Sequence, residues 1–106
     1  MENSPGYAVV LSSKAQSEMA ASWLWYEERE QGLGDRLFSA VMQKMNTIAE
    51  NPDIFSIKRN PYREAKVSVF PFVIADKIYK RKKLIEAISV FHTSRNPKRK
   101  YLIEVK

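Results

Sequence analysis

The sequence predicts an α+β domain in which an N-terminal strand and an antiparallel helical hairpin precede a three-stranded antiparallel meander, in the order β-α-α-β-β-β. Two segments of the first half place apolar residues at the period of an α-helix. The second half holds runs of Val, Ile and aromatic residues, typical of strands, that are separated by proline and by a lysine-rich turn. With 106 residues, we expect one domain spanning 1–106 with one modest core.

The first half is expected to form the strand and the hairpin. A short β-rich run at 7–11 follows residues 1–6, which we expect to be flexible. Ser12 or Ser13 then offers a hydroxyl that can accept a hydrogen bond from an unpaired N–H in the first turn of a helix. The two helices are predicted at 14–30 and 35–50, joined by a glycine-containing break at 31–34.

Each predicted helix carries one apolar stripe, which we interpret as core packing rather than a cofactor site. The stripe of the first helix is Ala15, Met19, Trp23 and Tyr26, widened by Ala20 and Leu24. The stripe of the second helix is Leu37, Phe38, Val41, Met45, Ile48 and Ala49. Two such stripes on a short connection indicate helices that pack against one face of a sheet.

The second half is expected to supply that sheet, which we predict to be curved and antiparallel. The run 84–91 is the most apolar, so we place it centrally, and we expect the face with Lys66 and Lys77 to be open and basic. The predicted segments are an irregular loop at 53–62, strands at 63–69, 72–79 and 84–91, a hairpin turn at 80–83, and a last strand or short helix at 101–105.

Composition excludes several classes of site. Cysteine is absent, which excludes disulfides and thiolate chemistry and fits a reducing compartment, so we expect a cytoplasmic protein. With no cysteine and a single histidine, we expect no metal site, and nothing indicates a cofactor. No apolar run reaches the length of a membrane span, and the N-terminus lacks the pattern of a signal peptide.

Charge is divided unevenly along the chain. Residues 1–53 hold four basic and eight acidic groups, a net charge of −4, whereas residues 54–106 hold fourteen basic and four acidic groups, a net charge of +10. This division indicates a polyanionic or acidic partner for the second half, although a solvated lysine-rich surface gives the same pattern. An acidic partner peptide that covers a basic face is one possible occupant.

Nucleic acid is another possible partner of the basic second half, because basic side chains can neutralise phosphates and tyrosines can stack on bases. Tyr62, Tyr79 and Tyr101 are the candidate stacking residues. The candidate contacts with nucleic acid or another target are Lys58, Arg59, Lys98, Arg99, Lys100 and Tyr101.

RNA cleavage is the sharpest chemical hypothesis. His92 is the only histidine, and a histidine can exchange protons near neutral pH. Its acid–base partner would be Glu64, Tyr101 or a lysine, and the alternative is a strand-end histidine hydrogen-bonded to a loop. The catalytic candidates, whose cationic members would stabilise the charge that develops on phosphate, are His92, Arg95, Arg63 and Lys66.

Several segments together resemble a known family over nearly the whole chain. They are Ala15 and Tyr26 in the first helix, Leu33-Gly34 and Phe38 in the second, Asn51-Pro52 at its end, Arg63, Phe70-Pro71-Phe72 with Val73-Ile74, and Phe91-His92-Thr93-Ser94-Arg95-Asn96-Pro97. With this pattern the sequence resembles the RelE/ParE superfamily of toxins from type II toxin–antitoxin systems, and most of all its ParE-like, plasmid-stabilisation branch.

The resemblance implies a bacterial toxin that inhibits growth and that a cognate antitoxin wraps and blocks, in a toxin–antitoxin hetero-oligomer. ParE-like members poison DNA gyrase and RelE-like members cleave mRNA on the ribosome, so the expected target is gyrase, with ribosome-bound mRNA as the alternative. The chain is an enzyme, an endoribonuclease, only under that alternative. A third possibility is an inactive protein of this fold that only binds its antitoxin.

Two positions depart from the family pattern. Phe72 stands where RelE-like ribonucleases place an arginine, whereas Lys66 and Arg95 match basic residues of that group. Asp76 stands where a tyrosine is common in the ParE-like branch, and we expect it to pair with Lys77, Arg81 or Arg95. We expect Arg63 and Arg95 to lie on the exposed basic face, so that their replacement by alanine reduces toxicity while the fold survives.

Overall fold

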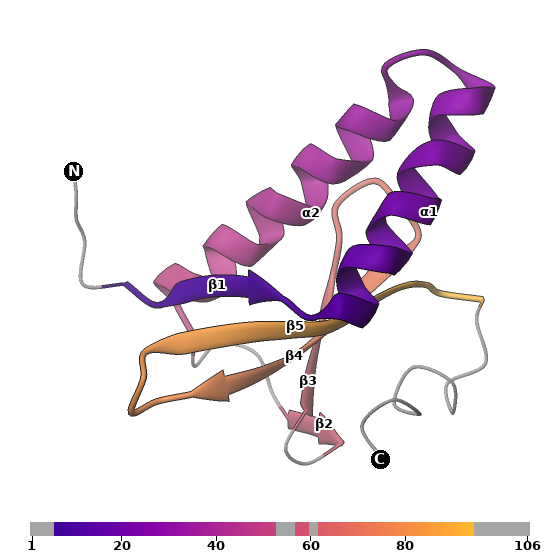
Figure 1. Cartoon of the computed structure of the whole chain (residues 1–106). Helices are drawn as coiled ribbons and strands as arrows, with labels where there is room; N and C mark the ends of the chain where they lie inside the picture. The colour runs from indigo at the N-terminus through magenta and orange to yellow at the C-terminus, as the bar shows by residue number, and fades with distance from the viewer. Residues whose placement is uncertain (1–5, 53–56, 60–61, 95–106) are drawn as a thin grey trace.

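The computed structural model describes residues 6–52, 57–59 and 62–94. Its order of one strand, two helices and then the meander confirms the predicted α+β class (Figure 1). The segment predicted at 101–105 lies outside the described residues. The elements are β1 (Ala8–Leu11), α1 (Ser13–Arg29), α2 (Leu33–Glu50), β2 (Ile57–Arg59), β3 (Tyr62–Lys66), β4 (Phe72–Tyr79) and β5 (Leu84–His92).

The strands form one mixed sheet in the order β1-β5-β4-β3-β2. The antiparallel meander is confirmed, but the whole sheet is mixed, because the N-terminal strand β1 pairs with β5 in parallel. Parallel neighbours need a long crossover connection, and the hairpin together with β2, β3 and β4 supplies it. The other three pairings are antiparallel, as the meander requires.

Two details of the sheet also differ from expectation. The segment 53–62, predicted as an irregular loop, contains the three-residue strand β2, which pairs with β3 through a register shift. The strand β5 has a neighbour on each side, but the middle of the sheet is β4. A three-residue edge strand carries too little periodicity to be recognised in a sequence.

The helical hairpin is closed by hydrogen bonds at both ends of α1. At its start, Ser12 adopts an extended conformation and its Oγ accepts from the N–H of Ala15 at 3.1 Å. At the tip, the Glu27 carboxylate accepts from the N–H of Gly32 at 2.7 Å and of Gly34 at 2.9 Å. This carboxylate caps the first turn of α2, whose N–H groups would otherwise be unpaired.

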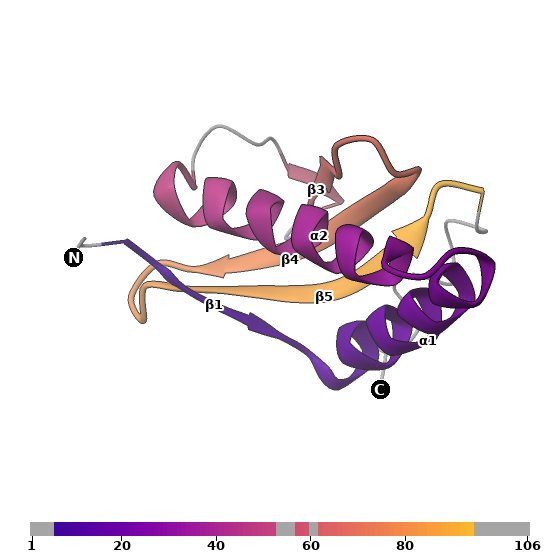
Figure 2. The ribbon, with the colours of Figure 1, turned by 90° about the horizontal axis from the view of Figure 1, so that it is seen from above.

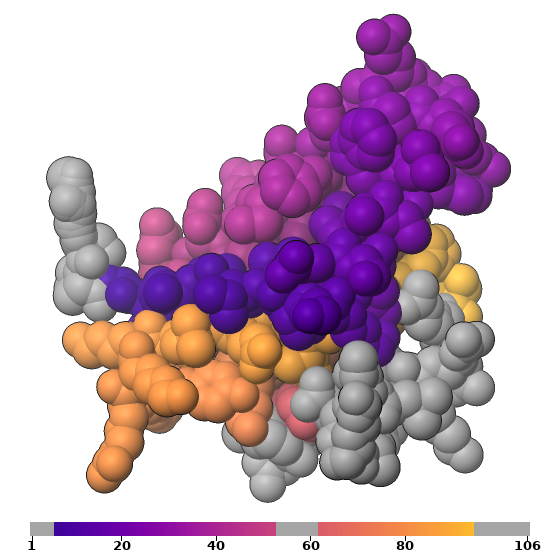
Figure 3. Space-filling view, in the orientation of Figure 1, coloured from indigo at the N-terminus to yellow at the C-terminus, as the bar shows by residue number. Residues whose placement is uncertain are grey.

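Both helices lie on one face of the sheet, and the tip of the hairpin projects beyond it (Figures 1–3). The predicted stripe of α2 is buried except for Phe38, which is 46% exposed. In α1 only Ala15 and Met19 are buried, because the later turns leave the sheet. The core between helices and sheet consists of those α1 and α2 residues with Ala65, Val67, Phe72, Ile74, Ile85, Ala87 and Val90.

The opposite face of the sheet holds a second apolar cluster. Along β4, Phe72 and Ile74 point to the helices, so the alternate residues Val73 and Ala75 point away from them. The buried members of this second cluster are Val73, Ala75, Ile88 and Phe91. The expectation of an open basic face is therefore wrong for the middle of the sheet, although Lys66 at its border is exposed.

Candidate functional site: an aromatic pocket at the end of β5

His92 is the last residue of β5 and pairs in register with Phe72 of β4. The two rings meet edge to face, with centroids 5.4 Å apart and planes at 75°. Beyond the strand the chain turns, and the N–H of Ser94 donates to His92 Nδ1 at 3.1 Å, with the Ser94 hydroxyl 2.8 Å away. A backbone N–H can only donate, so Nδ1 acts as the acceptor and the neutral ring carries its proton on Nε2.

This contact fits the alternative in which His92 is a strand-end residue hydrogen-bonded to a turn. It also gives the ring a defined orientation. Use of Nδ1 as a base would require the Ser94 N–H to lose its partner, which leaves Nε2–H as the available hydrogen-bonding group.

A pocket of about 470 Å³ opens between α1 and this end of the sheet. From α1 it takes residues spaced three and four apart, which therefore share one side of the helix. Tyr26 joins its two walls, because its ring lies 4.9 Å from that of Trp25 and 6.1 Å from that of Phe72. The lining residues are Ser17, Glu18, Ala21, Ser22, Trp25, Tyr26, Phe72 and His92.

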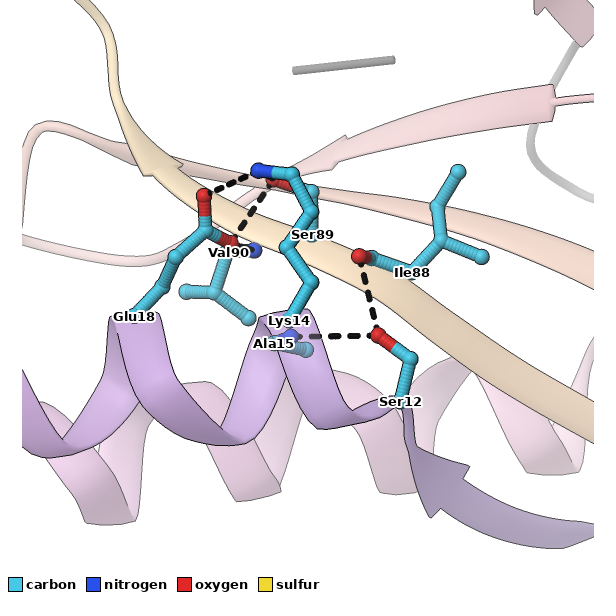
Figure 4. A network of polar contacts seen from close by, with 7 residues as sticks. All are labelled: Ser12, Lys14, Ala15, Glu18, Ile88, Ser89 and Val90. Carbon is cyan, nitrogen blue, oxygen red and sulfur yellow. Dashed lines mark hydrogen bonds and ion pairs between the residues drawn. The ribbon is translucent and has the colours of Figure 1, made fainter. Parts of the chain in front are cut away.

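The wall of the pocket is fixed by contacts between the start of α1 and the edge of β5 (Figure 4). Ser12, immediately after β1, continues the contacts with β5. Its N–H donates to the carbonyl of Ala87 at 2.9 Å, and its hydroxyl donates to the carbonyl of Ile88 at 3.0 Å. Glu18 Oε1 then accepts from the N–H of Val90 at 2.8 Å. These side chains stand where a neighbouring strand would pair, so the open edge of β5 is covered.

Glu18 is fully engaged in this network. Its Oε1 also accepts from the Ser89 hydroxyl at 2.8 Å, and its Oε2 forms an ion pair with Lys14 Nζ at 2.6 Å. The carboxylate therefore holds β5 in place two residues before His92, and its charge is balanced by Lys14. Glu18 lies outside the apolar stripe predicted for its helix, so its contact with the sheet was not expected.

Arg63 is buried rather than exposed, so the expectation that it lies on an open basic face is wrong. Only 3% of it is accessible, and its Nε donates to Asp76 Oδ1 at 2.8 Å while Nη1 donates to the carbonyl of Pro52. Asp76 forms its ion pair with Arg63, so the expectation that it pairs with Lys77 or Arg81 is wrong. Arg95, the third expected partner, lies outside the described residues. Replacement of Arg63 by alanine would remove a structural contact.

Burial dominates the electrostatics of this pair. Burial raises the pKa of Asp76 above 3.8, although the hydrogen bond and the charge of Arg63 act to lower it. Among the described residues, Arg63 Nη2 and Asp76 Oδ2 have no hydrogen-bond partner. The pair is consequently a costly structural contact beneath the end of α2 rather than an exposed site for a ligand.

The described candidates Lys58, Arg59 and Lys66 come from parts of the sheet away from His92. Lys66 pairs in register with Val73, so its side chain leaves the sheet on the face opposite His92 and Phe72. Lys58 and Arg59 belong to β2 at the far edge of the sheet. Their side chains are not described, and the candidates Arg95, Lys98, Arg99, Lys100 and Tyr101 lie outside the described residues.

Neither helix of the described part of the chain has the length and apolar character that crossing a membrane requires. Within residues 6–52, 57–59 and 62–94, no three acidic, histidine or cysteine side chains are grouped as metal ligands.

The pocket residues Trp25, Tyr26 and Ser22 were not recognised as candidate site residues in the sequence. One signal was present, because Trp25 falls outside the apolar stripe of its helix.

Comparison with known proteins identifies the family. The model of the family described as "ParE toxin of type II toxin-antitoxin system, parDE" matches residues 9–97. The chain belongs to the ParE toxin family. No curated protein matches the sequence.

Solved structures share the fold of this ParE-family chain. A chain of the chromosomal ParDE system from P. aeruginosa superposes with a TM-score of 0.71 at 10% identity, over 83% of this chain and 97% of that one. The RelBE2 toxin–antitoxin complex from Mycobacterium tuberculosis gives 0.63 at 13% identity, over 90% and 100%. The isolated E. coli RelE toxin gives 0.61 at 17% identity, over 93% and 97%.

Proposed function

We propose that this toxin acts as ParE-like proteins do, by poisoning DNA gyrase in the cytoplasm, and that a cognate antitoxin binds and neutralises it in a toxin–antitoxin complex. The family match over residues 9–97 is the observation that carries the proposal. Two of the similar solved structures, from P. aeruginosa and M. tuberculosis, come from toxin–antitoxin systems, which supports a partner of this kind.

The arrangement of the catalytic candidates supports a gyrase poison over a ribonuclease. RNA cleavage needs an acid, a base and a cation around one phosphate. Here His92 has Nδ1 engaged by Ser94, Arg63 is buried against Asp76, and Lys66 points to the other face. Arg95 and the cations after it stay proposed contacts with the target.

The test is induced expression of the chain, with and without any neighbouring open reading frame that encodes a candidate antitoxin. We expect growth arrest without that frame, accumulation of gyrase–DNA cleavage complexes, and intact mRNA. The Arg95→Ala variant should arrest growth less, with Lys106→Ala as a control that also removes one cation near the C-terminus.

Cut mRNA with normal gyrase would replace this mechanism with ribosome-dependent cleavage, as in RelE-like toxins. Normal growth at verified expression would leave only the inactive, antitoxin-binding protein. Arrest that persists when the neighbouring frame is co-expressed would refute the proposed antitoxin.

A further inference from the structure

We propose that the pocket between α1 and the end of β5 binds a base of single-stranded nucleic acid. This inference goes beyond the proposed function, since poisoning of gyrase does not by itself require a base pocket. Aromatic walls, hydrogen-bonding groups and the distribution of charge each support it.

Stacking surfaces are the first feature. Trp25 is 50% exposed, and the guanidinium of Arg29 lies 3.5 Å from the centre of its ring. Tyr26 meets Trp25 edge to face at an angle of 78°. The guanidinium covers one face of the indole, so a base would stack on the other face, and stacking of this kind contributes about 1–3 kcal/mol.

Hydrogen-bonding groups are the second feature. Ser17 and Ser22 bring hydroxyls to the lining from α1, and His92 brings an Nε2–H from β5. An aliphatic side chain from a protein partner would leave these groups without partners, whereas the edge of a base carries both donors and acceptors. The pocket is thus suited to a flat ring with a polar edge.

Charge is the third feature. The one carboxylate of the lining, Glu18, is neutralised by Lys14 and hydrogen-bonded to β5, so it does not repel a phosphate strongly. The chain immediately after His92 is strongly cationic in sequence, with Arg95, Lys98, Arg99 and Lys100 within six residues. Cations of this number favour a polyanionic ligand, whose phosphates they can neutralise.

A second pocket on the other side of α1 provides a control. It has a volume of about 340 Å³ and is almost wholly apolar. Trp23 lies in its wall, and its indole N–H already donates to Asp35 Oδ1 at 2.8 Å. Its lining residues are Leu11, Gln16, Met19, Ala20, Trp23 and Phe38.

The two tryptophans allow a direct test with the purified 106-residue chain. Tryptophan fluorescence is followed during titration with a short thymine deoxyribonucleotide oligomer, the matching uracil ribonucleotide oligomer, and an abasic oligomer of equal charge. We expect quenching by the base-containing oligomers in the unmodified protein and in Trp23→Phe, and none in Trp25→Phe. The base-containing oligomer that binds more tightly identifies the nucleic acid as DNA or RNA.

Filling each pocket separates base binding from general attraction to phosphate. Ala21→Leu narrows the proposed site and Ala20→Leu narrows the apolar one, and both positions are exposed on α1. We expect Ala21→Leu to weaken binding of the base-containing oligomer at least tenfold and Ala20→Leu to leave it unchanged.

Equal weakening by both variants, quenching that comes from Trp23, or equal quenching by the abasic oligomer would each overturn the base pocket. These outcomes are independent of growth arrest, so the base pocket and the proposed action on gyrase succeed or fail separately.

Discussion

Val69 has a backbone φ of +74° although it is β-branched, and its side chain is 92% exposed in the turn between β3 and β4. The left-handed region costs an L-residue about 1–2 kcal/mol, and glycine avoids this cost while losing more chain entropy on folding. We therefore expect Val69→Gly to raise the free energy of unfolding by about 1 kcal/mol in a urea titration.

The matched control is Val69→Ala, which removes the branch but keeps a Cβ atom in the same backbone conformation. It should stabilise the protein less than glycine does. A glycine variant that unfolds at lower urea than the unmodified protein would show that the valine side chain makes a stabilising contact outweighing its strain.

At the scale of residues, the sequence indicated where a side chain lies along its element better than how deeply it is buried. His92 was placed correctly at the end of a strand, because the apolar run before it has clear strand character. The burial of Arg63 could not be predicted, since arginine is usually exposed and its partner Asp76 is thirteen positions away. Long-range pairing of this kind depends on strand register, which sequence pattern specifies poorly.

At the scale of elements, the contact between α1 and α2 depends on Gly34. A Cβ atom at this position would lie 2.5 Å from the backbone oxygen of Trp23 and 2.9 Å from Glu27 Oε1. The backbone oxygen cannot move aside without shifting a whole turn of α1. Glycine thus permits the close approach of the helices and the capping of α2 by Glu27.

We expect Gly34→Ala to destabilise the protein by about 2 kcal/mol, because overpacking exceeds the gain of about 1 kcal/mol that alanine brings within a helix. Urea unfolding measures the change. Ser39→Ala, at an exposed position of the same helix, is the control and should be neutral or slightly stabilising. A stabilised Gly34→Ala variant would contradict the close approach.

The helices were predictable from their stripes and from Ser12, and the breaks from glycine and proline. The role of Gly34 was not, since a glycine near a helix start reads simply as a turn signal. The pocket was also hidden, because it depends on how far the hairpin projects beyond the sheet. That projection leaves Trp25 exposed instead of in the core.

At the scale of the whole molecule, the Arg63–Asp76 pair joins three elements. Arg63 comes from β3, Asp76 from β4, and the carbonyl of Pro52 from the turn that follows α2. Both side chains lie on the helix-facing side of the sheet, so the pair ties the hairpin to the sheet at the end distant from the pocket. Removal of one partner leaves the other charge buried.

The two partners should respond differently to removal. Asp76→Ala leaves a guanidinium that cannot release its proton, so we expect a loss of about 3–5 kcal/mol. Arg63→Met should cost less, because the remaining carboxyl can bind a proton. The double variant Arg63→Met/Asp76→Ala should lose less stability than the sum of the two single losses. We expect a coupling free energy of about 2 kcal/mol from a double-mutant cycle measured by urea unfolding. Additive losses would indicate that the two side chains do not stabilise each other.

The same pair predicts how stability depends on pH. Because burial raises the pKa of Asp76 in the folded state above 3.8, the folded protein binds this proton more tightly than the unfolded chain does. The contribution of Asp76 to stability is therefore greatest below pH 3.8 and is lost as pH rises through the folded-state pKa. The other carboxylates are common to the unmodified protein and the double variant, so their effects largely cancel in the difference between the two. We expect that difference in unfolding free energy to fall as pH rises above 3.8, and a difference that rises instead would show that the charge of Arg63 outweighs burial.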